Sequence, residues 1–106
     1  MNPILELLRE MRGRLPMYLG SNSLTKLASF LRGFEYALEK LGPAPEDHFL
    51  AAFQDAVQTR YAVKVSRSWE DILLFQSSDE NEAIDLFWRL FDDFCVKLTS
   101  GEKLAS

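Results

Sequence analysis

The sequence has one cysteine and one histidine among 106 residues, and these low counts limit the disulfides and metal sites that the chain can form. A single thiol excludes an intramolecular disulfide and argues against a cysteine-based zinc site. We expect Cys95 to act as a small buried hydrophobe and the chain to work in the reducing cytoplasm. His48 has no second histidine at ligand spacing, so we expect no metal site and no cofactor.

Glycine and long apolar runs are scarce as well. None of the five glycines falls in a G-x-G-x-x-G or G-x-x-x-x-G-K-[ST] pattern, so nucleotide binding has no support. No apolar run approaches the roughly 18 to 20 residues of a membrane helix, and the first residues lack a basic stretch followed by an apolar one. We therefore expect neither a membrane partner nor a secreted protein.

What the sequence does contain is typical of a globular domain. Apolar residues make up 47% and charged residues 26%, and the length suits one core, so we expect a single helical domain over 1–106. Eight phenylalanines are present, and large side chains of this kind supply much of the area that a small domain buries. The predicted core is dominated by phenylalanine and leucine.

Apolar spacing predicts two helices in the first half of the chain. Residues recur at three- and four-residue steps over 3–11 and over 24–41, the second helix ending at Gly42-Pro43. Glycine and proline punctuate 13–20, which predicts a structured loop. Gly33 interrupts the second helix, and we expect another backbone to pack closely against it.

The second half predicts three more helices and one ambiguous segment. One helix begins with Glu46 and Asp47, a short one follows Ser68 over 69–75, and a long one follows Asp79 and ends near Ser100-Gly101. Segment 61–65 has partial alternation, and strand, loop or helix end stay open, with loop or helix end preferred. The predicted fold is all-α, a compact bundle of about five helices.

The two tryptophans are candidates either for the core or for an interface. Trp69 lies near an apolar helical face, which predicts core packing. Trp88 follows Phe87 directly and cannot share its direction on a helix, which predicts partial exposure. Exposed tryptophans often anchor protein interfaces.

Charge is divided unevenly along the chain. Residues 1–40 carry a net charge of +2 and residues 41–106 a net charge of −6, giving −4 in total. An acidic surface repels nucleic-acid phosphates and attracts basic proteins, so we expect a protein partner and no direct nucleic-acid binding. A simpler interpretation is that these acids only keep a small protein soluble.

Several stretches carry a resemblance to a known group of proteins. They are RLPMYLGSNSLTKL at 14–27, which runs into FLRGF at 30–34, then WEDILLF at 69–75, DE at 79–80 and AIDLF at 83–87. Together they resemble small bacterial immunity proteins of polymorphic toxin systems, in particular those of contact-dependent growth inhibition.

The resemblance implies a protein that binds a toxin domain delivered by a neighbouring cell and blocks its active site. Such toxin domains are commonly nucleases with basic clefts. Carboxylates of the second half would then include the toxin-facing set: Glu70, Asp71, Asp79, Glu80, Glu82, Asp85, Asp92 and Asp93.

Two other functions stay open. A regulatory or scaffold module that binds another cytoplasmic protein would have the same acidic helical character. A small enzyme is the weakest alternative, because the chain offers few catalytic groups and no nucleophile elbow, so we expect no enzymatic activity.

Overall fold

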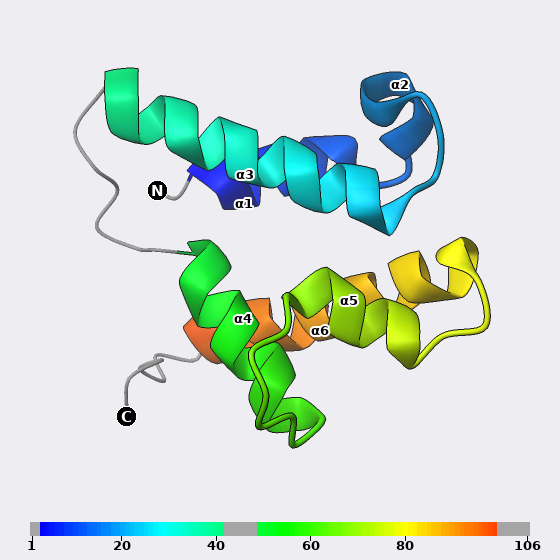
Figure 1. Cartoon of the computed structure of the whole chain (residues 1–106). Helices are drawn as coiled ribbons and strands as arrows, with labels where there is room; N and C mark the ends of the chain where they lie inside the picture. Colours follow the sequence, from blue (N-terminus) through cyan, green and yellow to red (C-terminus); the bar gives the residue numbers. More distant parts are fainter. Residues whose placement is uncertain (1–2, 42–48, 100–106) are drawn as a thin grey trace.

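The structure is all-α, as predicted. A computed structural model, shown in Figure 1, describes residues 3–41 and 49–99. Within these ranges it contains no strand. The helices described are α1 (Pro3–Met11), α2 (Leu15–Leu19), α3 (Leu24–Leu41), α4 (Phe49–Arg60), α5 (Trp69–Phe75) and α6 (Glu80–Thr99).

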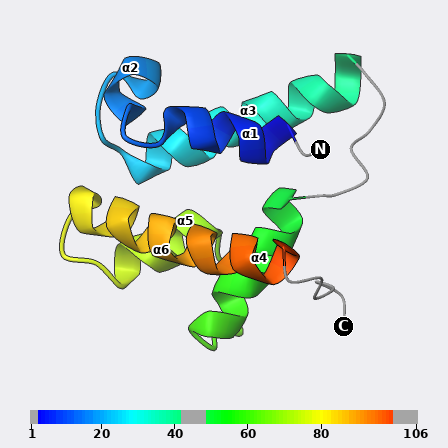
Figure 2. The same cartoon turned by 180° about the vertical axis from the view of Figure 1, so that it is seen from behind.

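The helices are arranged in two layers. Figure 1 and Figure 2 show α1, α2 and α3 together on one side, here called the N-terminal layer, and α4, α5 and α6 on the other, the C-terminal layer. Helix α3 contacts both α5 and α6 across the junction. One cluster of buried residues includes members of both layers, so the described part forms a single bundle.

The two layers bury different kinds of side chain. Every buried apolar residue of the N-terminal layer is aliphatic, whereas the C-terminal layer buries aromatic rings alongside aliphatic groups. The buried rings belong to Phe49, Phe53, Trp69, Phe87, Trp88, Phe91 and Phe94. The prediction of a core rich in phenylalanine and leucine is confirmed.

Segment 13–20 corrects one expectation, because a short helix, α2, replaces the predicted loop. Pro16 lies in the first turn of α2, where a missing N–H costs nothing. Gly20 ends the helix with a φ of 85°, and its N–H donates to the carbonyl of Pro16 at 2.9 Å. Proline and glycine therefore mark the two ends of a helix here.

The starts of α5 and α6 are capped in different ways. At α6 the N–H of Glu82 donates to Oδ1 of Asp79 at 2.8 Å, which confirms Asp79 as the cap. Ser68 precedes α5 as predicted, but its side chain makes no capping hydrogen bond. Instead the N–H of Trp69 donates to Oε1 of Gln54 at 2.7 Å, so α4 caps α5.

One further prediction agrees with the structure, and others concern residues that the structure does not describe. Segment 61–65 is neither helix nor strand, in line with the preferred loop or helix end, and it follows the last turn of α4. Glu46, Asp47, His48 and the stop at Ser100-Gly101 lie outside the described residues.

Two side-chain expectations are wrong. Apart from its chain neighbours and the nearby backbone of α3, no described atom lies within 4 Å of the place where a Cβ on Gly33 would stand, so no other backbone packs against it. Trp88 is 8% exposed and not partly exposed, because Phe87, Phe91 and the Arg12 guanidinium surround its ring. Trp69 is buried as predicted.

Between residues 3 and 41 and between 49 and 99, no helix has both the length and the apolar content needed to cross a bilayer.

Candidate functional site

The eight predicted toxin-facing carboxylates do not form one patch. The structure divides them into three groups by what each side chain contacts. One group faces the N-terminal layer, a second organises the start of α6, and the third is exposed to solvent and makes no hydrogen bond or ion pair with the described residues.

Glu70 belongs to the first group. Its side chain is 9% exposed and takes two hydrogen bonds from the Arg32 guanidinium, at 2.6 and 2.7 Å. Burial raises the pKa of this carboxyl, but the hydrogen bonds from Arg32 and the nearby charge outweigh burial and lower its pKa overall. Glu70 therefore holds α5 against α3 and presents no free carboxylate to a partner.

Asp92 also pairs with the N-terminal layer, but at the surface. Its carboxylate accepts two hydrogen bonds from Arg12 at 2.6 and 2.9 Å, and both side chains are about half exposed. These hydrogen bonds are the main cause that lowers the pKa of Asp92. The same guanidinium lies 4.8 Å from the centre of the Trp88 ring, so Arg12 joins a carboxylate and an aromatic face.

The second group lies at the start of α6. Asp79 caps the helix, and Oε1 of Glu82 accepts the N–H of Ser78 at 2.9 Å. Glu80 reaches the other layer, where its Oε2 accepts the N–H of Leu24 at 3.0 Å, at the start of α3. This carboxylate therefore satisfies a backbone donor of α3 that its own helix leaves free.

The third group consists of Asp71, Asp85 and Asp93. All three are exposed, and none makes an ion pair or hydrogen bond with the part of the chain that the structure describes. Asp71 belongs to α5, and the other two belong to α6. Their charges are available to a partner.

Helical spacing gathers charge along one side of α6. Five exposed residues, each three or four positions from another of them, share this side, which we call the outward face of α6: Glu82, Asp85, Arg89, Asp92 and Asp93. Four are acidic and one is basic. In Figure 2 this helix runs in front of α5. The outward face therefore offers a net negative strip on a rigid helix.

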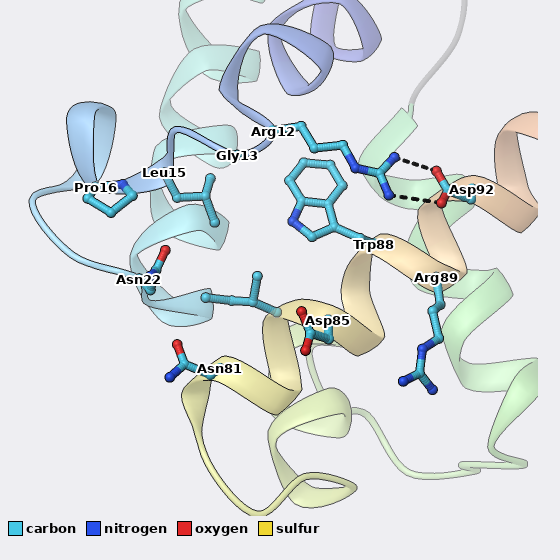
Figure 3. Close-up of a pocket in the computed structure, with 11 residues that line it drawn as sticks. Arg12, Gly13, Leu15, Pro16, Asn22, Asn81, Asp85, Trp88, Arg89 and Asp92 are labelled. Carbon is cyan, nitrogen blue, oxygen red and sulfur yellow. Dashed lines mark hydrogen bonds and ion pairs between the residues drawn. The ribbon is translucent and has the colours of Figure 1, made fainter.

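A groove lies beside this face, where α6 meets the turns on either side of α2. It has a volume of about 770 Å³. Figure 3 shows Trp88 at its centre, with the Arg12–Asp92 pair at one end and two asparagine side chains at the other. Its lining is Arg12, Gly13, Leu15, Pro16, Asn22, Asn81, Ile84, Asp85, Trp88, Arg89 and Asp92.

The two layers also differ in net charge. Residues 3–41 have six basic and four acidic side chains, a net charge of +2, whereas residues 49–99 have five basic and nine acidic ones, a net charge of −4. Both of the salt bridges found within the described ranges, Arg12–Asp92 and Arg32–Glu70, cross between the layers. Part of the acidity of the C-terminal layer therefore neutralises the N-terminal layer.

The described residues offer little for covalent or metal chemistry. No three of their Cys, Asp and Glu side chains come close enough together to hold a metal ion. Cys95 is half-buried against the core, and burial raises the pKa of its thiol, which favours the less reactive neutral form.

Sequence reasoning missed the groove and both cross-layer arginines. Arg12, Asn22 and Asn81 come from three separate turns or helix ends, and no local pattern links them. Arg32 lies 38 residues before its partner Glu70. Among the lining residues, the sequence pointed only to Trp88, as a candidate for the core or an interface, and to Asp85 and Asp92, as toxin-facing carboxylates.

No protein-family profile, curated protein or solved structure matches this chain. Its function must therefore be argued from its own residues. The strongest features are the outward face of α6 and the groove beside it.

Proposed function

We propose that this chain is an immunity protein, which binds a cognate toxin domain in the cytoplasm and covers its basic active-site cleft. The toxin in this proposal is a nuclease. The observation that carries the proposal is the outward face of α6, where four carboxylates and one arginine lie exposed along a single helix.

Electrostatics explains how such a face would inhibit a nuclease. A cleft that binds nucleic-acid phosphates is positively charged, and a strip of carboxylates can occupy the same positions. Opposite charges raise the association rate, and packing of apolar groups slows dissociation. Because α6 is packed against α3, α4 and α5, its carboxylates need little ordering on binding.

Contacts within the chain exclude some carboxylates from the set that we propose to contact the toxin. Glu70 is buried under Arg32, and Glu80 is bound to the start of α3, so neither belongs to it. Asp92 is paired with Arg12 and contributes less net charge. Asp71 is on α5 and not on the outward face of α6, so it lies outside the set. Asp85 and Asp93 carry the proposal, with Glu82 beside them.

The test begins with the gene immediately upstream, whose last domain is expected to be a basic toxin. Expressed alone, that domain should arrest growth, and co-expression of this chain should restore it. Binding measured by titration calorimetry should weaken as salt is raised, because exposed charges are screened. Asp85→Asn combined with Asp93→Asn should raise Kd by about ten- to a hundredfold.

The matched control carries the same change in charge elsewhere. Asp55 on α4 and Asp71 on α5 are also exposed, so Asp55→Asn with Asp71→Asn should leave Kd within about twofold. Equal weakening by both pairs would contradict a role for α6. A partner that binds this face but is no toxin would favour the regulatory or scaffold function instead.

A further inference from the structure

The groove beside α6 contains polar side chains that the fold leaves without partners. The carboxamides of Asn22 and Asn81 and the carboxylate of Asp85 make no hydrogen bond or ion pair with the described residues. The indole N–H of Trp88 makes no hydrogen bond there either, although its ring makes three aromatic or cation–π contacts. Unpaired groups gathered in one hollow are the usual pattern of a binding site.

The charges that line the groove are not equivalent. Arg12 and Asp92 neutralise each other through two hydrogen bonds. Arg89 also lines the groove, but in Figure 3 its side chain extends away from Asn22 and Asn81, whereas Asp85 lies on their side. Asp85 and Arg89 are the two lining charges without an ion pair, and of these Asp85 lies on the side of Asn22 and Asn81.

The groove is also suited to the stem of a long side chain. Ile84 and Leu15 are apolar residues of its lining, on α6 and α2 respectively. Figure 3 shows the indole nitrogen of Trp88 turned toward Leu15. A side chain that lies here would meet apolar walls along its length and oxygen acceptors at its end.

We propose that this groove binds one arginine side chain projecting from the basic partner. The carboxylate of Asp85 and the amide oxygens of Asn22 and Asn81 would accept hydrogen bonds from its guanidinium, whose five donors lie in one plane. Its methylene groups would pack on Ile84 and Leu15. This inference rests on the proposed function, since it names the group by which the toxin domain is held.

Charge complementarity selects arginine over other occupants. A negatively charged side chain would face Asp85 without compensation, and a purely apolar one would leave three polar groups unpaired. Arginine satisfies all three acceptors from one side chain, and it is enriched among residues that dominate interface energies.

The test uses the full chain labelled with ¹⁵N and a blocked tripeptide, acetyl-Ala-Arg-Ala-amide, titrated into the millimolar range. A peptide with citrulline in place of arginine is the matched probe, because it keeps the shape and removes the charge. The arginine peptide should shift the indole signal of Trp88 and the side-chain amide signals of Asn22 and Asn81. The indole signal of Trp69, which is buried in the core, should not move.

Two substitutions test whether Asp85 is the carboxylate that binds the arginine of the peptide. Asp85→Asn should weaken binding of the arginine peptide by about tenfold, and Asp55→Asn on α4 should leave it unchanged. A stationary Trp88 signal, equal shifts with the citrulline peptide, or equal loss in both variants would overturn the proposal. The peptide titration contains no toxin, so it tests the groove separately from the proposed function. If the chain binds the arginine peptide but no toxin, only the proposed function is refuted. If it binds a toxin but not the peptide, only the arginine site is refuted.

Discussion

The two layers of this bundle differ both in what they bury and in what they carry on their surface. The N-terminal layer packs aliphatic side chains and has a net charge of +2, and the C-terminal layer packs aromatic rings and has a net charge of −4. The carboxylates of the C-terminal layer fall into two sets with different roles. Glu70, Glu80 and Asp92 contact the N-terminal layer and join the layers, whereas Asp85 and Asp93 on the outward face of α6 are left for a partner.

The largest expected effect sharpens the contrast between the two layers of the core. Phe53 is fully buried, and its ring lies 5.3 to 5.7 Å from the rings of Phe49, Trp69, Phe87 and Phe94. Phe53→Ala should lower the free energy of unfolding by about 3–5 kcal/mol, because it leaves a cavity and removes several ring contacts. Chemical denaturation measures this loss.

The matched change in the aliphatic N-terminal layer is Leu27→Ala, since Leu27 is also fully buried. It should cost about 2–4 kcal/mol and less than Phe53→Ala, because fewer atoms are removed and no ring contacts are lost. A greater loss from Leu27→Ala would show that the aromatic layer is not the more firmly packed one.

The next effect concerns the ion pair that joins α5 to α3. Glu70→Gln should cost about 1–3 kcal/mol at neutral pH, since it weakens two charge-assisted hydrogen bonds from Arg32. The loss stays below that of a fully buried pair because the Arg32 side chain is 46% exposed and can turn to water. Thermal unfolding at pH 7 measures it.

The same pair predicts a pH dependence. The pKa of Glu70 is lowered by folding, so its contribution is complete above the unfolded pKa and is lost as pH falls through the folded pKa. The wild type should therefore lose more stability between pH 6 and about pH 3 than Glu70→Gln does. Identical pH profiles would contradict this role, and Asp71→Asn, next to it but exposed, should follow the wild type.

A smaller effect has the opposite sign. Gly33 lies within α3, and no described atom beyond its chain neighbours and the nearby helix backbone lies within 4 Å of where its Cβ would stand. Gly33→Ala should raise the free energy of unfolding by about 0.5–1 kcal/mol, because alanine loses less conformational freedom in a helix. Destabilisation instead would mean that a close contact at this position does exist.

The smallest effect comes from the exposed pair between the layers. Arg12 and Asp92 are about half exposed, so their coupling should be about 0.2–1 kcal/mol in a double-mutant cycle of Arg12→Ala and Asp92→Ala. The coupling should shrink in high salt. If the coupling energy of Arg12 with Asp92 were as large as that of Arg32 with Glu70, the exposed ion pair would stabilise the fold as much as the partly buried one, contrary to this prediction.

Most of the fold could be predicted from the sequence because its signals are local. Apolar spacing gives α1 and α3 with their observed bounds, and Asp79 marks the start of α6. Segment 13–20 was misjudged because Pro16 and Gly20 can flank a helix as well as break one. The error at Gly33 arose because a missing Cβ does not reveal what faces it.

The candidate site was less predictable because it depends on contacts between distant residues. Composition identified the acidic half, but it could not distinguish Glu70, which faces Arg32, from Asp85, which faces solvent. The burial of Trp88 likewise depends on Arg12, which lies on the other layer. Such pairings are set by how helices meet, and no local pattern encodes them.

The most direct test of the central claim is carboxylate footprinting. Carbodiimide coupling followed by mass spectrometry would compare the labelling of each carboxylate in the free chain and in its complex with the upstream-encoded domain. If the outward face of α6 covers the cleft of the toxin, Glu82, Asp85 and Asp93 should be protected in the complex, and Asp55 and Asp71 should be labelled equally in both states. Protection of Asp55 and Asp71 with the α6 carboxylates still reactive would contradict it.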